Sequence, residues 1–345
     1  MIVDVCRFEQ DQELEWDRYV HRHPSATHCH LSAWRHAIQR SYGHKAFYLW
    51  AHEDGDTKGI LPLVLIRSRL FGRSLVSLPF LDGGGVCADD HPTKIELCQQ
   101  ALRVCEDYRV DFLDLRHREP SGLDLPLHGS KVTLLLDLAE SPDRMWDRFD
   151  GKLRNQIRKA QKSGLTVSWS GLEGIDAFYD IFASNMRDLG SPVHSRRFFA
   201  AVVEEFSEGA RLILVKKGSQ TIGGAVCLSF KDTLLVPWAS SLRDYLSICP
   251  NNLLYWEVIR WGCEKGYQRL DFGRSSPGTG TYRFKKQWGT VEVPLRWQCL
   301  GRKRDRAAVV ESGDPNYAWI VRIWKHLPVA ITKMIGPVLR RHMSN

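Results

Sequence analysis

The sequence lacks a long apolar run, a paired-cysteine motif and any low-complexity segment. No window approaches the roughly eighteen uncharged apolar residues that a bilayer span requires, so we expect no membrane span. Residues 1–20 carry acids where a secretory signal needs a basic head and an apolar run, and we expect no signal peptide. These absences favour an ordinary globular protein of the cytoplasm.

Cysteine and histidine give no metal pattern. The nine cysteines are scattered and none lies in a CxxC, which is typical of free thiols in a reducing compartment. The segment "HRHPSATHCH" (21–30) crowds four histidines, but no second ligand group of suitable spacing accompanies them. We therefore predict solvated loop histidines and no metal.

The net charge of +8 is unevenly placed. Residues 301–345 hold nine Lys/Arg and three Asp/Glu, which gives +6 in this segment. A second basic run, 152–162, has five Lys/Arg and no acid. Such patches attract phosphates and acidic glycans, but neither is a nucleic-acid motif, and we expect no DNA binding.

The two halves of the chain share one pattern, in the order helix, helix, strand, strand, strand, helix, strand. The first half has helices at 13–22 and 31–42, a hairpin at 46–68, a strand at 74–80, a helix at 92–108 and a strand at 111–115. The second has helices at 174–187 and 195–207, a hairpin at 210–230, a strand at 233–241, a helix at 251–267 and a strand at 269–273. This repetition predicts a duplicated α/β domain with mixed sheets. We place the domains at 1–130 and 131–300, with a linker near 118–130 and a basic helical tail at 301–345.

Residues 142–163 predict one helix that stops before Gly164. Leu153, Ile157 and Ala160 fall on one stripe, and Arg154, Arg158 and Lys162 on a second. A row of like charges costs a few tenths of a kcal/mol per pair on an exposed helix. The second stripe is therefore either a solvated face or a binding surface for an anion.

The stretch "YRFKKQWG" (282–289) follows the glycine-rich "DFGRSSPGTG" (271–280). One interpretation is an amphipathic helix with Lys285 and Lys286 in solvent and Phe284 and Trp288 in the core. The other is a site in which one of the two lysines meets an anion. About 100° separates neighbouring side chains on a helix, so only one of them is expected to face such a site.

Three strings resemble motifs of the Fem family, and they occur in the family's order: "KLRNQIRKAQKSG" (152–164), "NNLLYWEVIRWGCEKGYQRLDFGRSS" (251–276) and "GTYRFKKQWG" (280–289). These FemAB-like peptidyltransferases have two tandem GNAT-like acyltransferase domains, and the resemblance covers most of residues 15–300. The whole length is also similar to a FemAB-like subgroup found with exosortase/PEP-CTERM systems in Gram-negative bacteria that make exopolysaccharide.

The resemblance implies an N-acyltransferase in which an amine attacks an activated ester, usually of an aminoacyl-tRNA. Phe284 and Lys285 match the family's Phe-Lys pair beside the ester, so Lys285 is expected to stabilise the oxyanion and Phe284 to shape the site. Lys286 is the other candidate for stabilising the oxyanion; otherwise it is expected to hold a phosphate of the acyl donor. Asp271 and Tyr282 are the candidate proton acceptors by motif position; the alternative for Asp271 is a salt bridge to Arg274 or a loop cap.

Further residues are candidates for substrate binding, with a core position as the alternative for Trp238. They are Arg154, Asn155, Arg158, Lys159, Trp238, Asn252, Tyr255, Arg274, Ser275, Tyr282 and Lys286.

The donor and the acceptor are not fixed by the motifs. Acyl-CoA enzymes of this fold cradle pyrophosphate in a glycine-rich loop before a helix, but 240–252 has no glycine and Pro250 lacks a donor. An aminoacyl-tRNA donor is therefore favoured over acyl-CoA, with no permanently bound cofactor. "LDGGGV" (81–86) is interpreted as an interface or acceptor-side loop. Arg35 and His36 stand where the family's acceptor-binding lysine is expected, so the acceptor is given only as an amine of a peptidoglycan or exopolysaccharide precursor.

The tail carries tryptophans and cations, and Pro328 and Pro337 divide it into short helices. Basic amphipathic segments of this kind lie on anionic membranes, which would make the protein peripheral to the inner membrane through 315–345. The alternative is packing on the first domain. Three rival functions remain: an acyl-CoA-dependent N-acyltransferase, a non-catalytic glycan- or RNA-binding module, and a membrane-surface scaffold.

Overall fold

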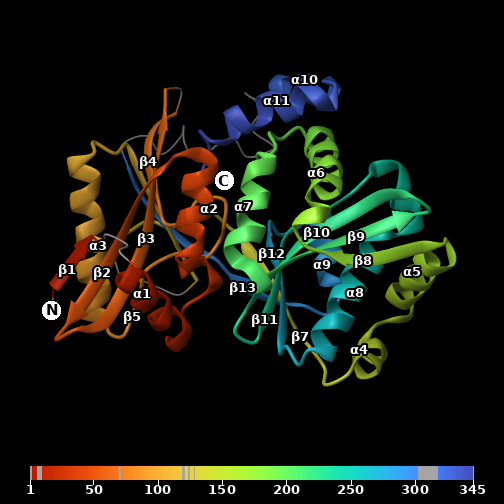
Figure 1. Cartoon of the computed structure of the whole chain (residues 1–345), viewed down its shortest axis with the longest axis horizontal. Helices are drawn as coiled ribbons and strands as arrows, with labels where there is room; N and C mark the ends of the chain where they lie inside the picture. Colours follow the sequence, from red (N-terminus) through yellow and green to blue (C-terminus); the bar gives the residue numbers. More distant parts are fainter. Residues whose placement is uncertain are drawn as a thin grey trace. The chain divides into compact units, whose positions relative to one another are not determined.

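The computed structural model describes residues 2–5, 10–69, 71–118, 121–122, 125–127, 129–301 and 318–344 (Figure 1). The chain forms two compact units. The first comprises Met1–Ser130, Pro294–Pro315 and Val338–Asn345, and the second comprises Lys131–Val293 and Asn316–Pro337. Cys6 and residues 302–317 of the tail lie outside the described residues.

The first unit is a mixed sheet with helices on both faces. Its strand order is β1-β2-β3-β4-β6-β14, with β5 paired to β3. The strands are β1 (Ile2–Val5), β2 (Lys45–Glu53), β3 (Asp56–Ser68), β4 (Gly72–Val76), β5 (Cys87–Ala88), β6 (Phe112–His117) and β14 (Arg296–Gly301). The helices are α1 (Gln10–Arg22), the 3₁₀ turn η1 (His28–His30), α2 (Ala33–Tyr42) and α3 (His91–Asp107).

Alternation along β2 explains how this sheet buries both faces. Phe47 and Leu49 belong to the core that α3 shares. Tyr48, between them, turns to the other face and packs on Trp16 of α1 with ring centroids 5.0 Å apart. The two faces are therefore covered by α3 and by α1.

The second unit has a sheet of order β13-β7-β12-β11-β10-β9-β8. Its strands are β7 (Val132–Asp137), β8 (Leu165–Ser170), β9 (Ala210–Lys217), β10 (Gln220–Phe230), β11 (Thr233–Ser241), β12 (Arg269–Ser275) and β13 (Val291–Pro294). Its α-helices are α4 (Pro142–Arg148), α5 (Gly151–Lys162), α6 (Ile175–Leu189), α7 (Arg196–Phe206), α8 (Pro250–Glu264) and α9 (Gly280–Lys286). The short 3₁₀ turns are η2 (Leu172–Gly174), η3 (Ser207–Gly209) and η4 (Arg243–Ile248).

In Figure 1 the sheet of the second unit lies between α6 and α7 on one side and α8 on the other. Leu254 and Val258 of α8 and Ile157 of α5 share one core with Leu270 and Phe272 of β12. Helices α6, α7 and α8 are the three that the repeated pattern predicts for this unit, and the four strands β9-β10-β11-β12 follow the same order as β2-β3-β4-β6. In both units the last pair of these strands is parallel, so the expected duplicated α/β fold is confirmed.

The single helix predicted over 142–163 is wrong, because the chain breaks into α4 and α5. Phe149 leaves the helix with ψ 144°, and the Asp150 carboxylate caps α5 by accepting a hydrogen bond from the Leu153 N–H at 2.6 Å. An aspartate at this position satisfies one of the orphan donors of a helix start, which favours a new helix over a continuous one.

The edges of the units differ from the predicted domain limits. Residues 296–300 of β14 belong to the predicted second domain, but this strand pairs with β6 in the first unit's sheet. The described tail forms α10 (Ala318–His326) and α11 (Val329–Arg340). Helix α10 packs against α6 of the second unit, so the expected packing of the tail on the first domain is wrong for this helix. Among the described residues, no helix combines the length and hydropathy needed to cross a membrane.

Candidate functional site

Lys285 lies against the end of strand β12. It sits near the end of α9, whose start is capped by the Thr279 hydroxyl accepting from the Tyr282 N–H at 3.3 Å. The Lys285 Nζ donates to the carbonyl oxygens of Gly273 and Arg274 at 3.0 and 2.9 Å. Two carbonyl acceptors fix where this ammonium lies and how it is oriented.

These two carbonyls belong to a distorted part of β12. The pairing of β12 with β7 shifts register between Asp271 and Arg274, and Gly273 has φ 74°, which glycine adopts without strain. The Asp271 carboxylate is 1% exposed and accepts hydrogen bonds from the Gly273 N–H at 2.8 Å and the Thr133 hydroxyl at 2.5 Å. Asp271 therefore holds the bulge that presents the two carbonyls to Lys285. This is the loop-capping role that the sequence analysis gave as an alternative to proton acceptance.

Beside this bulge the sheet opens. Strands β11 and β12 pair only over 233–235 and 269–271, although they continue to Ser241 and Ser275. A bulge also shifts the pairing of β10 with β11 between Val226 and Leu228. Strand ends that part in this way offer backbone polar groups to a ligand, and Lys285 reaches the β12 side of the opening.

An aromatic cluster supports α9. Phe284 packs on Tyr255 with centroids 5.5 Å apart, and Tyr255 stacks on Phe272 at 4.9 Å and 11°. Trp288 is 1% exposed and contacts Phe149, Tyr255, Phe272 and Phe284. Burial raises the pKa of Tyr255, so its hydroxyl stays protonated. Tyr255, predicted to be a substrate-binding group, is a buried part of this core.

Lys286 and Tyr282 face a different partner. The Lys286 Nζ donates to the Thr290 carbonyl at 2.9 Å and lies 3.4 Å from a Glu292 carboxylate oxygen. The Tyr282 hydroxyl donates to the same carboxylate. That hydrogen bond raises the pKa of Tyr282, which makes Tyr282 a poor proton acceptor. Of the two lysines, Lys285 is therefore the one that points to β12.

Helix α5 presents the predicted cations and packs on α8. Arg158, Lys159 and Asn155 are exposed. The Arg158 guanidinium lies 5.3 Å from the Trp146 ring centroid, a cation–π distance. The Arg154 Nε is enclosed and has no hydrogen-bond partner among the described residues.

The other predicted polar groups are dispersed over the second unit. Asn252 is buried and its amide donates to the Gln156 side-chain oxygen at 3.0 Å, which ties α8 to α5. Ser275 is buried, and its hydroxyl has no partner among the described residues. Arg274 contributes its carbonyl to Lys285. Trp238 packs on Phe198 and Phe199 of α7, with centroids 5.5 and 5.3 Å away, and so takes the core position given as its alternative.

The first unit holds buried histidines. His28 and His30 are 4% and 3% exposed, so the prediction of solvated histidines is wrong for these two residues. The His30 Nε2 lies 2.8 Å from the Gly85 carbonyl, within the glycine-rich loop at 81–86, and burial lowers the pKa of His30 to about 4. Among the described residues, no group of His, Cys, Asp or Glu side chains is arranged to hold a metal. The eight described cysteines are free thiols.

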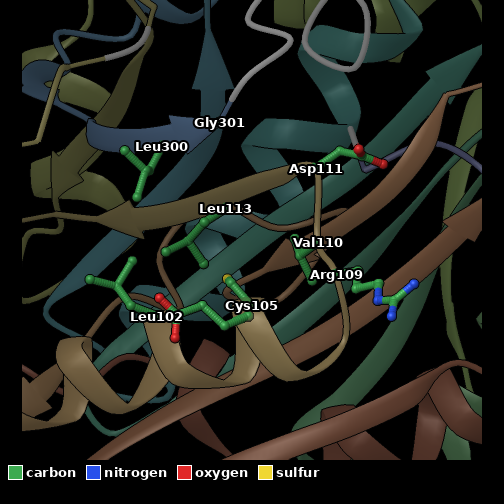
Figure 2. A pocket seen from close by; sticks show the side chains of 9 residues that line it. Leu102, Cys105, Arg109, Val110, Asp111, Leu113, Leu300 and Gly301 are labelled. Atoms are coloured by element: carbon green, nitrogen blue, oxygen red, sulfur yellow. The ribbon is translucent and has the colours of Figure 1, made fainter.

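The first unit also contains a cavity of about 780 Å³ (Figure 2). Leu102 and Cys105 of α3, Leu113 of β6 and Leu300 of β14 line it, and burial raises the pKa of the Cys105 thiol to about 12. A thiol with this pKa is not a nucleophile at neutral pH. None of the predicted site residues lines this cavity, so sequence reasoning gives it no role.

Comparisons with known proteins show what this chain is similar to in sequence and fold. The family model of the acetyltransferase (GNAT) domain matches residues 148–286. The lipid II:glycine glycyltransferase of Staphylococcus haemolyticus (strain JCSC1435) is 20% identical over 378 residues, covering 80% of this chain and 88% of that protein.

Two solved structures share the whole fold. FemX superposes with a TM-score of 0.69 at 16% identity, over 93% of this chain and 100% of FemX. A tandem GNAT protein from the clavulanic acid biosynthesis pathway superposes with a TM-score of 0.52 at 11% identity, over 87% of this chain and 98% of that one.

Fold and comparisons together define the class: the protein is an amide-forming acyltransferase with two tandem GNAT-like domains. Within that class it is similar to the Fem transferases, as the three sequence motifs indicated. An enzyme of this class needs an acyl donor as a co-substrate.

Proposed function

We propose that the protein transfers an aminoacyl group from a charged tRNA to an amine of a cell-envelope precursor, as a Fem-type transferase. The precursor is a peptidoglycan or exopolysaccharide intermediate, and the resemblance to the exosortase/PEP-CTERM subgroup favours exopolysaccharide. The observation that carries the proposal is the position of Lys285, an ammonium fixed by two carbonyls where β11 and β12 part.

In the proposed reaction, a neutral amine attacks the ester carbonyl carbon. A C–N bond forms, the carbonyl oxygen becomes an oxyanion, and the C–O bond to the tRNA ribose then breaks as the amine loses its proton. Lys285 stabilises the oxyanion, since a fixed donor does so without reorganisation at the moment of reaction. Phe284 covers the site from α9 and is held in place by Tyr255.

Asp271 acts in this proposal as a positioning residue. Its Oδ1 already accepts from the Gly273 N–H and the Thr133 hydroxyl, and these bonds shape the carbonyl platform under Lys285. The amine proton leaves through water or through the substrate.

Replacing Asp271 distinguishes this role from general-base catalysis. Asp271→Asn keeps an oxygen that accepts the same two bonds, so kcat is expected to stay within about tenfold of wild type, whereas a lost general base costs roughly 10²–10⁴-fold. Asp271→Ala removes both acceptors and is expected to be worse than Asp271→Asn. Steady-state kinetics at several pH values measures both; an Asn variant as slow as the Ala variant would restore Asp271 as the base.

We propose that α5 holds phosphates of the tRNA. Arg158 and Lys159 are exposed, the enclosed Arg154 Nε has no partner among the described residues, and the loop 240–252 that would cradle the pyrophosphate of CoA contains no glycine. Loop residues 243–248 form the 3₁₀ turn η4, and Pro250 occupies the first position of α8, where an N–H would otherwise point at a phosphate.

The double variant Arg158→Gln/Lys159→Gln tests this surface. Each lost phosphate contact is expected to lower the slope of log K against log salt by roughly 0.7–0.9, so binding of charged tRNA weakens and becomes less salt-dependent. The matched control is Lys216→Gln/Lys217→Gln on β9, which removes the same charge elsewhere in this unit. Filter binding at several NaCl concentrations measures both slopes, and equal slopes for the two variants would remove α5 from the site.

A further inference from the structure

Helices α10 and α11 carry an apolar stripe that their own unit does not cover. Trp319 and Ile323 on α10 are 63% and 55% exposed, and Met334 on α11 is 70% exposed. Ile320, Ile331 and Ile335 add to the stripe. Globular proteins rarely expose so many large apolar side chains in neighbouring turns unless the surface binds something.

The opposite side of these helices is fixed to the second unit. Trp324 is buried, and Val321 packs at Gly190, the left-handed residue that ends α6. The Arg187 guanidinium donates to the Leu327 carbonyl at 3.2 Å, and Lys333 pairs with Asp180. On α11, Thr332 and Gly336 form the packed side, and Gly336 lies against Val193.

These anchors set which way the stripe faces. In α11 the packed positions 332 and 336 and the exposed positions 331, 334 and 335 follow the helical period, so they occupy different faces of the helix. Packing of the opposite face on the second unit therefore keeps these residues directed to solvent, and they are not part of the hydrophobic core.

The charge of the segment indicates what covers the stripe. Residues 318–344 contain five Lys/Arg (322, 325, 333, 340 and 341) and no Asp or Glu, which gives +5. Lys333 and Lys325 lie on the packed side, at Asp180 and at Gly190, whereas Arg322 is exposed one helical turn from Trp319. A second copy of this chain would bring another positively charged segment to the stripe, and like charges across an interface oppose association. An anionic surface instead meets both the cations and the apolar stripe.

The geometry also restricts how such a surface is engaged. Helices α10 and α11 have 9 and 12 residues, so at 1.5 Å per residue each is far shorter than a bilayer core of about 30 Å. They suit the interfacial plane of a membrane, where apolar side chains enter the acyl boundary and long cations reach the phosphates.

We propose that α10 and α11 form a docking surface for an anionic phospholipid bilayer, with Trp319, Ile323 and Met334 inserted and Arg322 on the phosphates. The surface would bring the transferase to a lipid-linked acceptor. Binding itself needs neither acyl donor nor acceptor, so it stands or falls independently of the proposed reaction.

Co-sedimentation of the full-length protein with vesicles tests the proposal. The probes are vesicles of phosphatidylcholine alone and of phosphatidylcholine with phosphatidylglycerol, each at low and high NaCl. Binding is expected only to the phosphatidylglycerol vesicles and is expected to weaken at high salt. Equal binding to both kinds of vesicle, or to neither, would overturn the proposal.

Three variants locate the surface. Arg322→Gln is expected to lower the partition coefficient roughly fivefold, the effect of one surface cation. Met334→Asp is expected to lower it roughly tenfold, because it removes inserted apolar area and adds an anion. Leu246→Asp is the matched control, since Leu246 is a similarly exposed apolar residue of η4, and it is expected to bind as wild type.

Two outcomes of the variant series contradict the proposal. In one, Leu246→Asp weakens binding as much as Met334→Asp, which would mean that the effect is one of net charge. In the other, light scattering shows a dimer that Met334→Asp converts to a monomer, which would mean that a second copy covers the stripe.

Discussion

Replacing Lys285 with alanine is expected to lower kcat for acyl transfer roughly a hundred- to a thousandfold, the cost of removing one fixed oxyanion donor. The fold should persist, because the side chain is only half-buried and its two hydrogen bonds go to carbonyls of one strand. Such bonds contribute about 1 kcal/mol each to the free energy of unfolding. Single-turnover kinetics and urea denaturation measure the two quantities separately.

Lys286→Ala is the matched control, since it removes the neighbouring cation from the same helix. The Lys286 side chain contacts Thr290 and Glu292 and points away from the proposed oxyanion. The Lys286→Ala variant is therefore expected to lose less than about tenfold in kcat, because such a cation contributes only through long-range attraction. If Lys286→Ala were as slow as Lys285→Ala, or Lys285→Ala turned over normally, the assignment of the oxyanion donor to Lys285 would be wrong.

Trp288→Ala is expected to destabilise the second unit by about 3–5 kcal/mol, the range measured for removal of a large buried aromatic side chain. Trp288 is 1% exposed and contacts four aromatic rings, one each from the α4–α5 link, α8, β12 and α9. Its loss leaves a cavity beneath Phe284 and Tyr255, so transfer activity should also fall. Urea denaturation followed by circular dichroism measures the stability change.

The control for this variant is Trp319→Ala, which removes the same side chain from an exposed position on α10. A change within about 0.5 kcal/mol is expected there. If Trp288→Ala changed stability no more than Trp319→Ala, the aromatic cluster would not be the support of α9.

The repeated α/β order could be predicted because apolar periodicity and turn residues mark each hairpin and helix. The break between α4 and α5 could not be predicted in the same way. Met145, Phe149, Leu153 and Ile157 continue a four-residue spacing across it, so the periodicity looks like that of one helix. The cap at Asp150 outweighs that periodicity. Strands β7 and β8 were not predicted. Strand β7 pairs with β12, which is distant in sequence, and β8 lies at the edge of the sheet beside β9.

For the site, the motif identified a pair of lysines but not their directions. Those directions depend on the β12 bulge and on Glu292 of β13, which are tertiary features. Asp271 looked like a base because it ends a strand, whereas its bonds to Gly273 and Thr133 appear only once β7 and β12 pair. Likewise, His30 looked solvated because its burial depends on the distant loop at 81–86. The ring of His28 packs on Trp34 of α2, with ring centroids 5.8 Å apart.

The most direct test of the proposed reaction is a parallel turnover measurement with the two kinds of donor. Purified protein is incubated with radiolabelled aminoacyl-tRNAs or with a panel of radiolabelled acyl-CoAs, with lipid II and an amino-sugar polymer as acceptors. The proposal predicts amide-linked label from charged tRNA alone, and its loss in Lys285→Ala. Transfer from acyl-CoA would instead make this a CoA-dependent N-acyltransferase, and binding of RNA or glycan without transfer from either donor would contradict the proposed reaction altogether.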